Sequence, residues 1–356
     1  MAGAEQSGSG GSGPKPVVCF LGPTSSYTHQ ATMSAFPEDR FELMPVTTIK
    51  DIFDTTQSGA AKYGVVPFEN STNGSVVFTL DNFADRSDVY PDLNVCQEIY
   101  LDVHHCLLGH AAAADREEGE TGNGGDASGQ RTPTALNPHS LSHVRRVYSH
   151  PQAFGQCMLF LDARLRGVET VDVSSTSRAA HLAKEDPTGE SAAISSAVAA
   201  KALGLDVLAR NIEDRQDNTT RFFVLRRGID GESPSFPSSS SQPGGAREKE
   251  NVEEEDDDAQ LLSSTKSLLS FTVPHRSPGA LADVLSCFRR GGLNLTSINS
   301  RPSLIGPFEY IFFVEFEGHR FRDPRGRVTG VLDEIAAIAG MSRWLGSWEN
   351  MRRGPT

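Results

Sequence analysis

The chain has 356 residues, a length typical of two or three domains with apolar cores. Its formal net charge of −13 excludes a nucleic-acid-binding surface of the usual basic kind. Its apolar runs are far shorter than the roughly 20 residues that span a bilayer, so neither nucleic acid nor a membrane is expected as a partner. Much of the acidic excess is local, since residues 253–258 are consecutive Glu and Asp.

The cysteines and the N-terminal residues indicate a reducing compartment. The five cysteines are odd in number, lie among apolar neighbours and lack C-x-x-C spacing, which favours reduced core residues over disulfides or zinc ligands. Residues 1–15 are rich in Gly and Ser, which predicts a disordered tail without an apolar signal core or an Arg-rich targeting pattern. A cytoplasmic location is therefore expected. The cysteines are Cys19, Cys96, Cys106, Cys157 and Cys287.

The first globular segment begins with a short apolar strand, residues 17–21, which ends at Gly22-Pro23. Hydroxyl side chains follow at residues 24–28, and then a helical pattern runs through Ala31 and Met33. Free N–H groups and hydroxyls at a helix start favour a bound anion. The same residues also cap helices without any ligand, and the pattern alone leaves both interpretations open.

A second helix is predicted from Ile49, Ile52 and Phe53, and a buried strand at residues 63–68 follows it. The polar residues 69–75 come after this strand and precede a helical segment at 76–83. In open α/β sheets the carboxyl ends of strands are where ligands bind. A strand at 99–108 then carries His104 and His105, which face opposite sides of a strand and therefore cannot share one metal ion.

Residues 111–143 form a low-complexity insertion, which we expect to be a disordered loop. The strand around Val147 ends in the donors Ser149, His150 and Gln152, and a helix follows that continues through Leu161. Residues 171–177 repeat this arrangement more weakly, and residues 191–203 are Ala-rich.

Residues 211–225 combine a polar turn with the apolar strand 222–225, and Thr220 and Arg221 lie at their junction. Taken alone, this stretch favours ordinary strand residues, although functional side chains often lie at such junctions. Residues 229–265 read as a flexible acidic linker. Residues 266–350 then show strand, helix, two strands, helix and strand, the βαββαβ order of a ferredoxin-like domain.

Motifs for nucleotide binding, zinc hydrolysis or a serine nucleophile are absent, so no cofactor and no metal are expected. The chain instead closely resembles the prephenate dehydratase family, over roughly residues 16–228 and 266–350. The catalytic segments that carry the resemblance are Phe20-Leu21-Gly22-Pro23, Tyr27-Thr28-His29, Gly64-Val65-Val66-Pro67-Phe68-Glu69-Asn70-Ser71, Tyr148-Ser149-His150-Pro151-Gln152-Ala153, Asn211-Ile212-Glu213-Asp214, Asn218 and Thr220-Arg221-Phe222. The segments Pro278-Gly279-Ala280-Leu281 and Asn299-Ser300-Arg301-Pro302 resemble the phenylalanine-sensing motifs of the attached ACT domain.

The resemblance implies an α/β fold, with a two-lobed, periplasmic-binding-protein-like catalytic domain at 16–228 and a ferredoxin-like ACT regulatory domain at 266–350. It implies decarboxylating dehydration of prephenate to phenylpyruvate in L-phenylalanine biosynthesis, with L-phenylalanine as allosteric effector and a homodimer or homotetramer as the assembly. Two departures stand out. Ser25 replaces a usual Gly, and Asn299 replaces a usual Glu, which places the strength of phenylalanine control in question.

The family's essential threonine corresponds to Thr220, whose hydroxyl is too weak an acid to act alone. We therefore expect Thr220 to hydrogen-bond the departing hydroxyl and to pass on a proton relayed through water or a neighbour. Arg221 is expected either to hold a carboxylate or to form an ion pair with Asp214 or Asp217. The other expected substrate contacts are Asn70, Ser71, Ser149, Gln152, Ser26 and Thr28. The expected phenylalanine site comprises Gly279, Ala280, Leu281, Asn299, Ser300, Arg301 and Pro302.

Two rival functions remain on the sequence alone. One is a dehydratase that acts on arogenate, and the other is a non-catalytic small-molecule-binding protein of the same fold. Comparing the turnover of prephenate and arogenate tests the first rival. The effect of replacing Thr220 on turnover tests the second.

Overall fold

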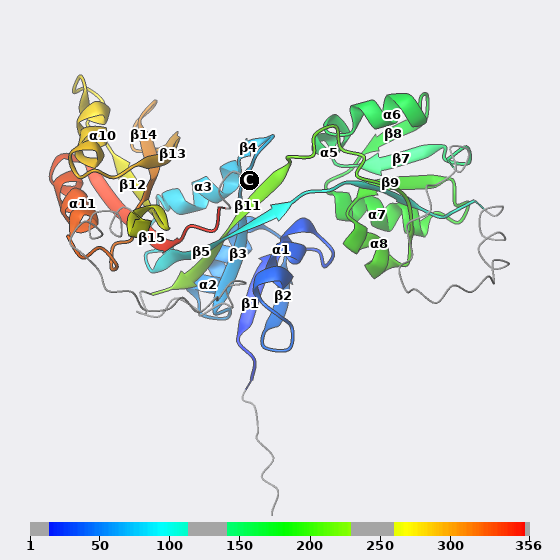
Figure 1. The fold of residues 1–356 in the computed structure, drawn as a ribbon, viewed down its shortest axis with the longest axis horizontal. Coiled ribbons are helices and arrows are strands. Elements are labelled where there is room, and N and C mark those ends of the chain that lie inside the picture. The colour runs from blue at the N-terminus through cyan, green and yellow to red at the C-terminus, as the bar shows by residue number, and fades with distance from the viewer. Residues whose placement is uncertain (1–13, 113–140, 229–259, 353–356) are drawn as a thin grey trace, which may run out of the picture.

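The computed structural model describes residues 14–112, 141–228 and 260–352. The predicted tail, insertion and linker fall for the most part outside these residues. Two sheets organise the described chain, one of ten strands and one of five. In Figure 1 they lie side by side, and the chain enters the five-stranded sheet and later returns from it.

The first lobe is built on part of the ten-stranded sheet, in the order β5-β11-β3-β1-β2. β1 is buried along its centre, as expected of a parallel strand between helices. Ser26 caps α1, and Thr48 and Asp51 form a capping box on α2. The elements are β1 (Val17–Leu21), α1 (Tyr27–Ala35), β2 (Glu42–Val46), α2 (Ile49–Gln57), β3 (Tyr63–Asn70), β4 (Gly74–Ser75), α3 (Val77–Ala84), β5 (Leu93–Asp102) and β11 (Thr219–Arg227).

The second lobe contains the five-stranded sheet, in the order β10-β6-β9-β7-β8. The strand predicted at 99–108 is in fact two strands, because the chain leaves one sheet after Asp102 and enters the other at Cys106. The helix predicted from Ala153 through Leu161 is likewise broken at residues 156–157. The elements are β6 (Cys106–Gly109), β7 (Arg146–Ser149), α5 (Pro151–Gly155), α6 (Met158–Arg164), β8 (Glu169–Asp172), α7 (Thr176–Glu185), β9 (Ser191–Ser195), α8 (Ala197–Leu203) and β10 (Asp206–Arg210).

The C-terminal domain has the predicted βαββαβ order, which confirms the ferredoxin-like arrangement. Its four strands are antiparallel in the order β13-β14-β12-β15, and α10 and α11 pack on one another and on the sheet. The elements are β12 (Thr265–Thr272), α10 (Ala280–Arg290), β13 (Leu295–Pro302), β14 (Tyr310–Glu317), α11 (Arg327–Ile338) and β15 (Met341–Glu349).

The C-terminal domain continues the sheet of the first lobe. β15 pairs with β5 in parallel where Gly346 lies opposite Val95. One apolar core includes Phe68, Phe223 and Trp348, and the Phe223 and Trp348 rings lie 5.0 Å apart. The first lobe and the C-terminal domain therefore share a core, whereas the second lobe has cores of its own.

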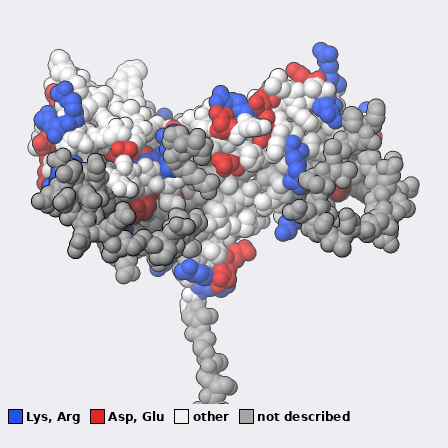
Figure 2. Space-filling model, in the orientation of Figure 1, with Lys and Arg blue, Asp and Glu red and all other residues white. Residues whose placement is uncertain are grey.

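The described surface in Figure 2 shows acidic and basic side chains interspersed, without an extended basic stripe on the face in view. Among the described residues, no helix combines the length and the apolar character needed to cross a membrane.

Candidate active site

Two chain segments, residues 103–105 and 211–218, connect the lobes and run beside each other. The backbone N–H of Val103 donates to the Asn218 carbonyl at 2.7 Å, and the N–H of Ile212 donates to the His105 carbonyl at 3.0 Å. The second segment leads directly into β11, and Thr220 is the second residue of that strand. Thr220 therefore lies where both connections meet the first lobe.

Thr220 lies opposite Asn70 in the pairing of β11 with β3, and the two side chains are hydrogen-bonded. The Asn70 Nδ2 donates to Thr220 Oγ1 at 3.0 Å. The Asn70 Oδ1 accepts from the backbone N–H groups of Thr72 and Asn73, at 3.0 Å each, which determines the orientation of the amide. Because Thr220 Oγ1 already accepts a hydrogen bond, its own hydrogen is free to be donated elsewhere.

A chain of side-chain hydrogen bonds continues from Asn70 across both lobes. The Asn70 Nδ2 also donates to Asn218 Oδ1 at 2.7 Å, and the Asn218 Nδ2 donates to Gln156 Oε1 at 3.2 Å. Gln156 Oε1 lies 2.7 Å from His105 Nε2, and His105 Nδ1 lies 2.9 Å from the Tyr27 hydroxyl. Because Gln156 presents its oxygen, His105 carries a hydrogen on Nε2, and the Tyr27 hydroxyl lies within donating distance of both His105 Nδ1 and the His104 carbonyl, at 2.9 Å and 3.1 Å.

The buried environment of His105 favours the neutral form of its imidazole over the protonated form. Burial lowers the pKa of His105, and the Gln156 bond and the Glu213 carboxylate offset this only in part. Glu213 is itself buried, accepts from the His105 backbone N–H at 2.8 Å and pairs with His104 Nδ1 at 2.8 Å. Glu213 belongs to the second connecting segment, and its bonds to His104 and His105 hold the first connecting segment in place.

The predicted catalytic residue Thr220 and the predicted substrate residue Asn70 are in direct contact, and a second predicted substrate residue, Ser71, is next to them. The Ser71 hydroxyl donates to the Asp217 carbonyl at 3.0 Å and accepts from the Thr219 N–H at 3.0 Å. Ser71 therefore holds the turn that leads into β11, and its role towards a substrate stays a prediction.

The hydroxyls of Ser26 and Ser149 are engaged within the protein. Ser26 accepts from the His29 N–H at 3.1 Å and donates to the Leu21 carbonyl at 3.0 Å, so the capping interpretation accounts for it. Ser149 is fully buried and donates to the Ile194 carbonyl at 3.0 Å. These bonds engage both hydroxyls within the protein, as for Ser71, and the role of Ser26 and Ser149 towards a substrate stays a prediction. Thr28 is buried in α1, and Gln152 is exposed in the first turn of α5.

The predicted ion pair from Arg221 to Asp214 or Asp217 is wrong. Arg221 pairs instead with Glu98 of β5 and Glu315 of β14, so its charge is already matched. Asp214 accepts from the backbone N–H groups at 158 and 159 and so caps α6, while Asp217 pairs with Arg215. Because both partners of Arg221 are buried, we withdraw its expected contact with a substrate carboxylate.

Sequence reasoning missed the roles of His105 and Gln156. Their contacts join residues 51 and 62 positions apart, which no local pattern reveals. The one available signal is the position of Gln156 between the buried residues Phe154 and Cys157, where an uncharged amide needs hydrogen-bond partners.

Comparison with known proteins shows the family to which the chain belongs. The family model for prephenate dehydratase matches residues 18–229, which is more than half of the chain. The chain belongs to the prephenate dehydratase family. The predicted family membership is thereby confirmed, and the matched segment contains both lobes and the Thr220 network.

Similar proteins extend the match to nearly the whole chain. A bifunctional chorismate mutase/prephenate dehydratase of Aquifex aeolicus is 32% identical over 334 residues, covering 94% of this chain and 74% of that protein. A solved prephenate dehydratase of Arthrobacter aurescens in complex with L-Phe aligns with a TM-score of 0.70 and 26% identity, over 96% of this chain and 92% of that one. The solved structure of GqqA, described as a quorum quenching acylase, aligns with a TM-score of 0.65 and 25% identity, over 94% and 97% of the two chains.

The seven residues expected to bind phenylalanine lie in two places within this dehydratase-family chain. Gly279, Ala280 and Leu281 line a cavity of 480 Å³ at the start of α10, where Gly279 has a φ of +83°. The segment from Asn299 to Pro302 faces the first lobe. Its contacts are Ser75 Oγ to Asn299 Oδ1 at 2.7 Å, a bidentate Arg301–Asp81 pair at 2.9 Å, and Arg86 to the Pro302 carbonyl at 2.8 Å, while Ser300 is exposed.

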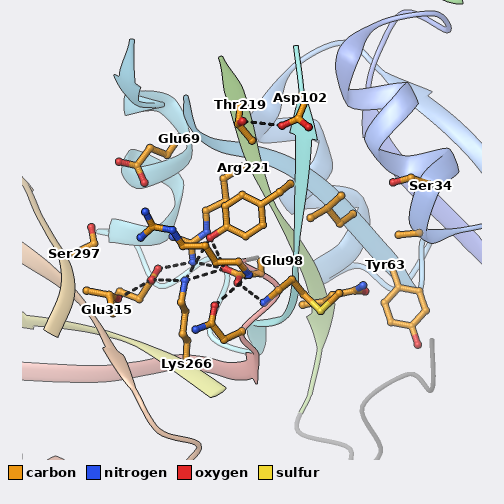
Figure 3. Close-up of a pocket in the computed structure, with 18 of the residues that line it drawn as sticks. Ser34, Tyr63, Glu69, Glu98, Asp102, Thr219, Arg221, Lys266, Ser297 and Glu315 are labelled. Atoms are coloured by element: carbon orange, nitrogen blue, oxygen red, sulfur yellow. Dashed lines mark hydrogen bonds and ion pairs between the residues drawn. The ribbon is translucent and has the colours of Figure 1, made fainter. Parts of the chain in front are cut away.

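A larger cavity, of 1620 Å³, lies on the other face of β11 and extends from the first lobe to the C-terminal domain. Thr219 and Arg221 line it and Thr220 does not, as strand alternation requires. Figure 3 shows charged side chains of both domains converging in it. Ser71 also lines this cavity, so it reaches the turn beside Thr220, although the Thr220 side chain lies on the opposite face of the strand.

Proposed function

We propose that the chain is a carbon–oxygen lyase that converts prephenate to phenylpyruvate, with Thr220 as the catalytic residue. The observation that carries this proposal is the Asn70–Thr220 bond, which leaves the Thr220 hydrogen free to be donated. Asn70, Ser71, Ser149, Gln152, Ser26 and Thr28 are the other proposed substrate contacts. No step requires a cofactor.

The proposed reaction breaks two bonds of the substrate ring. The C–C bond to the ring carboxylate breaks, carbon dioxide leaves, and the electron pair enters the ring. The C–O bond to the ring hydroxyl breaks with its electron pair, and this oxygen takes one proton and departs as water. Thr220 donates a hydrogen bond to that oxygen and passes on a proton that solvent replaces, since a threonine hydroxyl alone is too weak an acid.

Replacing Thr220 by Val tests this role. The isosteric side chain lacks the hydroxyl, so kcat should fall by about 10²–10³-fold, the usual loss for an acid–base or hydrogen-bonding catalytic group. Prephenate binding, measured by calorimetry, should change by no more than a few fold. Thr219→Val is the matched control, because Thr219 Oγ1 bonds Asp102 at 2.8 Å on the other face of the strand. Wild-type kcat in Thr220→Val would remove Thr220 from the mechanism.

Measuring the product formed from each acid separates the rival functions, because prephenate gives phenylpyruvate and arogenate gives phenylalanine. Turnover of arogenate in preference to prephenate would identify the arogenate dehydratase, and turnover of neither acid would favour a binding protein.

We further propose that L-phenylalanine binds the C-terminal domain around Gly279, Ala280 and Leu281 and lowers turnover, and that the protein is a homodimer or homotetramer. Light scattering measures that assembly directly. Inhibition requires phenylalanine to bind the less active arrangement more tightly.

A further inference from the structure

Four charged side chains form a buried cluster beside the larger cavity, where the first lobe meets the C-terminal domain (Figure 3). We call Arg221, Glu98, Lys266 and Glu315 the charge quartet. Arg221 Nη2 lies 2.5 Å from Glu98 Oε2 and 2.6 Å from Glu315 Oε2, and Lys266 Nζ lies 3.5 Å and 3.3 Å from the same two carboxylates. The four residues are exposed by 6%, 0%, 3% and 2%, in the order Arg221, Glu98, Lys266 and Glu315.

The charge quartet is balanced and its outer oxygens are also bonded. Glu98 Oε1 accepts from the Met351 N–H at 2.8 Å, and Glu315 Oε1 accepts from the Thr296 hydroxyl at 2.8 Å. Burial raises the pKa of Glu315, but Arg221 and Lys266 outweigh this and hold it below its ordinary value. Such a cluster adds little stability over well-packed apolar residues, and its distinctive property is the defined geometry it imposes.

The charge quartet joins two domains at the residue next to Thr220. Glu98 and Arg221 come from β5 and β11 of the first lobe, whereas Lys266 and Glu315 come from β12 and β14 of the C-terminal domain. The Arg221 guanidinium also lies over the rings of Phe68 and Phe223, at 5.5 Å and 4.8 Å. Thr220 and Arg221 share a peptide bond and point to opposite faces, so a displacement of Arg221 moves Thr220.

We propose that Glu315 is a positioning residue for Thr220. The C-terminal domain, through Glu315, holds Arg221 and thereby sets the place of the Thr220 hydroxyl relative to Asn70. This inference rests on the proposed function, because it assigns Glu315 to the same reaction. It makes the C-terminal domain part of the support of the active site as well as the proposed place of effector binding.

A double-mutant cycle tests the proposal. In the otherwise wild-type chain, Glu315→Gln should lower kcat about tenfold, a loss typical of a displaced catalytic group, with KM within about threefold. In the Thr220→Val background the same substitution should lower the residual kcat less than about twofold. The reason is that the Thr220 hydroxyl, whose position Glu315 is proposed to set, is already absent. A merely structural defect lowers kcat by the same factor in both backgrounds. Equal factors, or no loss in the wild-type background, would overturn the proposal.

The controls separate this idea from a folding defect and from a wrong function. Glu317→Gln changes the same strand face and the same cavity but lies outside the charge quartet, so its kcat should stay within about twofold. If Glu315→Gln does not fold, the charge-balanced pair Glu315→Gln with Lys266→Met takes its place in the cycle. If the wild-type protein does not turn over prephenate, the proposed function fails. Hydrogen exchange of residues 219–221 then decides the inference: it should be faster in Glu315→Gln than in Glu317→Gln, and equal rates would refute it.

Discussion

At the scale of single residues, the network around Thr220 depends on which atoms are donors. Asn70 is oriented by two backbone N–H groups, and each later side chain takes its orientation from the one before it. Donation from Asn70 through Asn218 and donation from His105 both end on Gln156 Oε1, and the hydrogen of Thr220 is left for a substrate. Neutral His105 belongs to this network, and its protonation supplies a pH test.

We expect the free energy of unfolding to decrease as the pH falls below 6.5, the ordinary pKa of His105. Burial lowers the pKa of His105 in the folded state, so the unfolded chain takes up a proton first. The stability linked to His105 is present above pH 6.5 and is lost as the pH falls through the lowered value. Chemical denaturation at pH 7 and pH 5 should show a smaller decrease in His105→Gln than in the wild type. The same decrease in both proteins would contradict this assignment.

The backbone conformation at Ser25 gives a physical reason for the glycine that the family usually has at this position. Its backbone φ is +79°, in the left-handed region that disfavours any residue with a Cβ. Ser25→Gly should therefore raise the free energy of unfolding by about 1 kcal/mol. The neighbouring Ser26→Ala should lower it by about 1 kcal/mol, because the N-cap of α1 is lost. Thermal denaturation of both variants checks the opposite signs, and destabilisation by Ser25→Gly would contradict the argument.

At the scale of elements, the junction between β15 and β5 depends on one glycine. Gly346 has a φ of +140°, and a Cβ there would lie 2.1 Å from the Val95 carbonyl oxygen. Gly346→Ala should therefore cost about 3 kcal/mol or more, since neither backbone can move without breaking the sheet. Gly330→Ala is the control: this exposed position in α11 has open space around it, so the substitution should add about 1 kcal/mol. Equal stability of the two variants in denaturant unfolding would refute the close approach.

At the scale of the molecule, shared cores predict which parts unfold together. Leu345 of β15 lies in the core that the first lobe shares with the C-terminal domain, whereas Leu108 of β6 lies in a core of the second lobe. Leu345→Ala should cost about 2–5 kcal/mol and reduce hydrogen-exchange protection in the first lobe and the C-terminal domain together. Leu108→Ala should reduce protection in the second lobe alone. Equal loss of protection throughout the chain after either substitution would indicate a single unfolding unit.

Local sequence predicted most elements correctly because their signals are local. The strand at Val17–Leu21, the helix that follows the hydroxyl residues and the βαββαβ order of the C-terminal domain all come from periodicity and turn residues within short windows. The motifs around Asn70 and Thr220 identified the family for the same reason, since each is a continuous run of residues. β2 was not predicted, because its residues are only partly buried and show no clear alternation.

Only the tertiary structure decided the partners of the charged and polar side chains. Arg221 takes Glu98 and Glu315, which lie 123 residues before it and 94 residues after it, in place of the nearby Asp214 or Asp217. Likewise, the hydroxyls of Ser26 and Ser149 are turned inward to carbonyl groups. The physical reason is that local sequence sets backbone preferences, whereas the pairing of a buried charge depends on which strands become neighbours in the folded sheet.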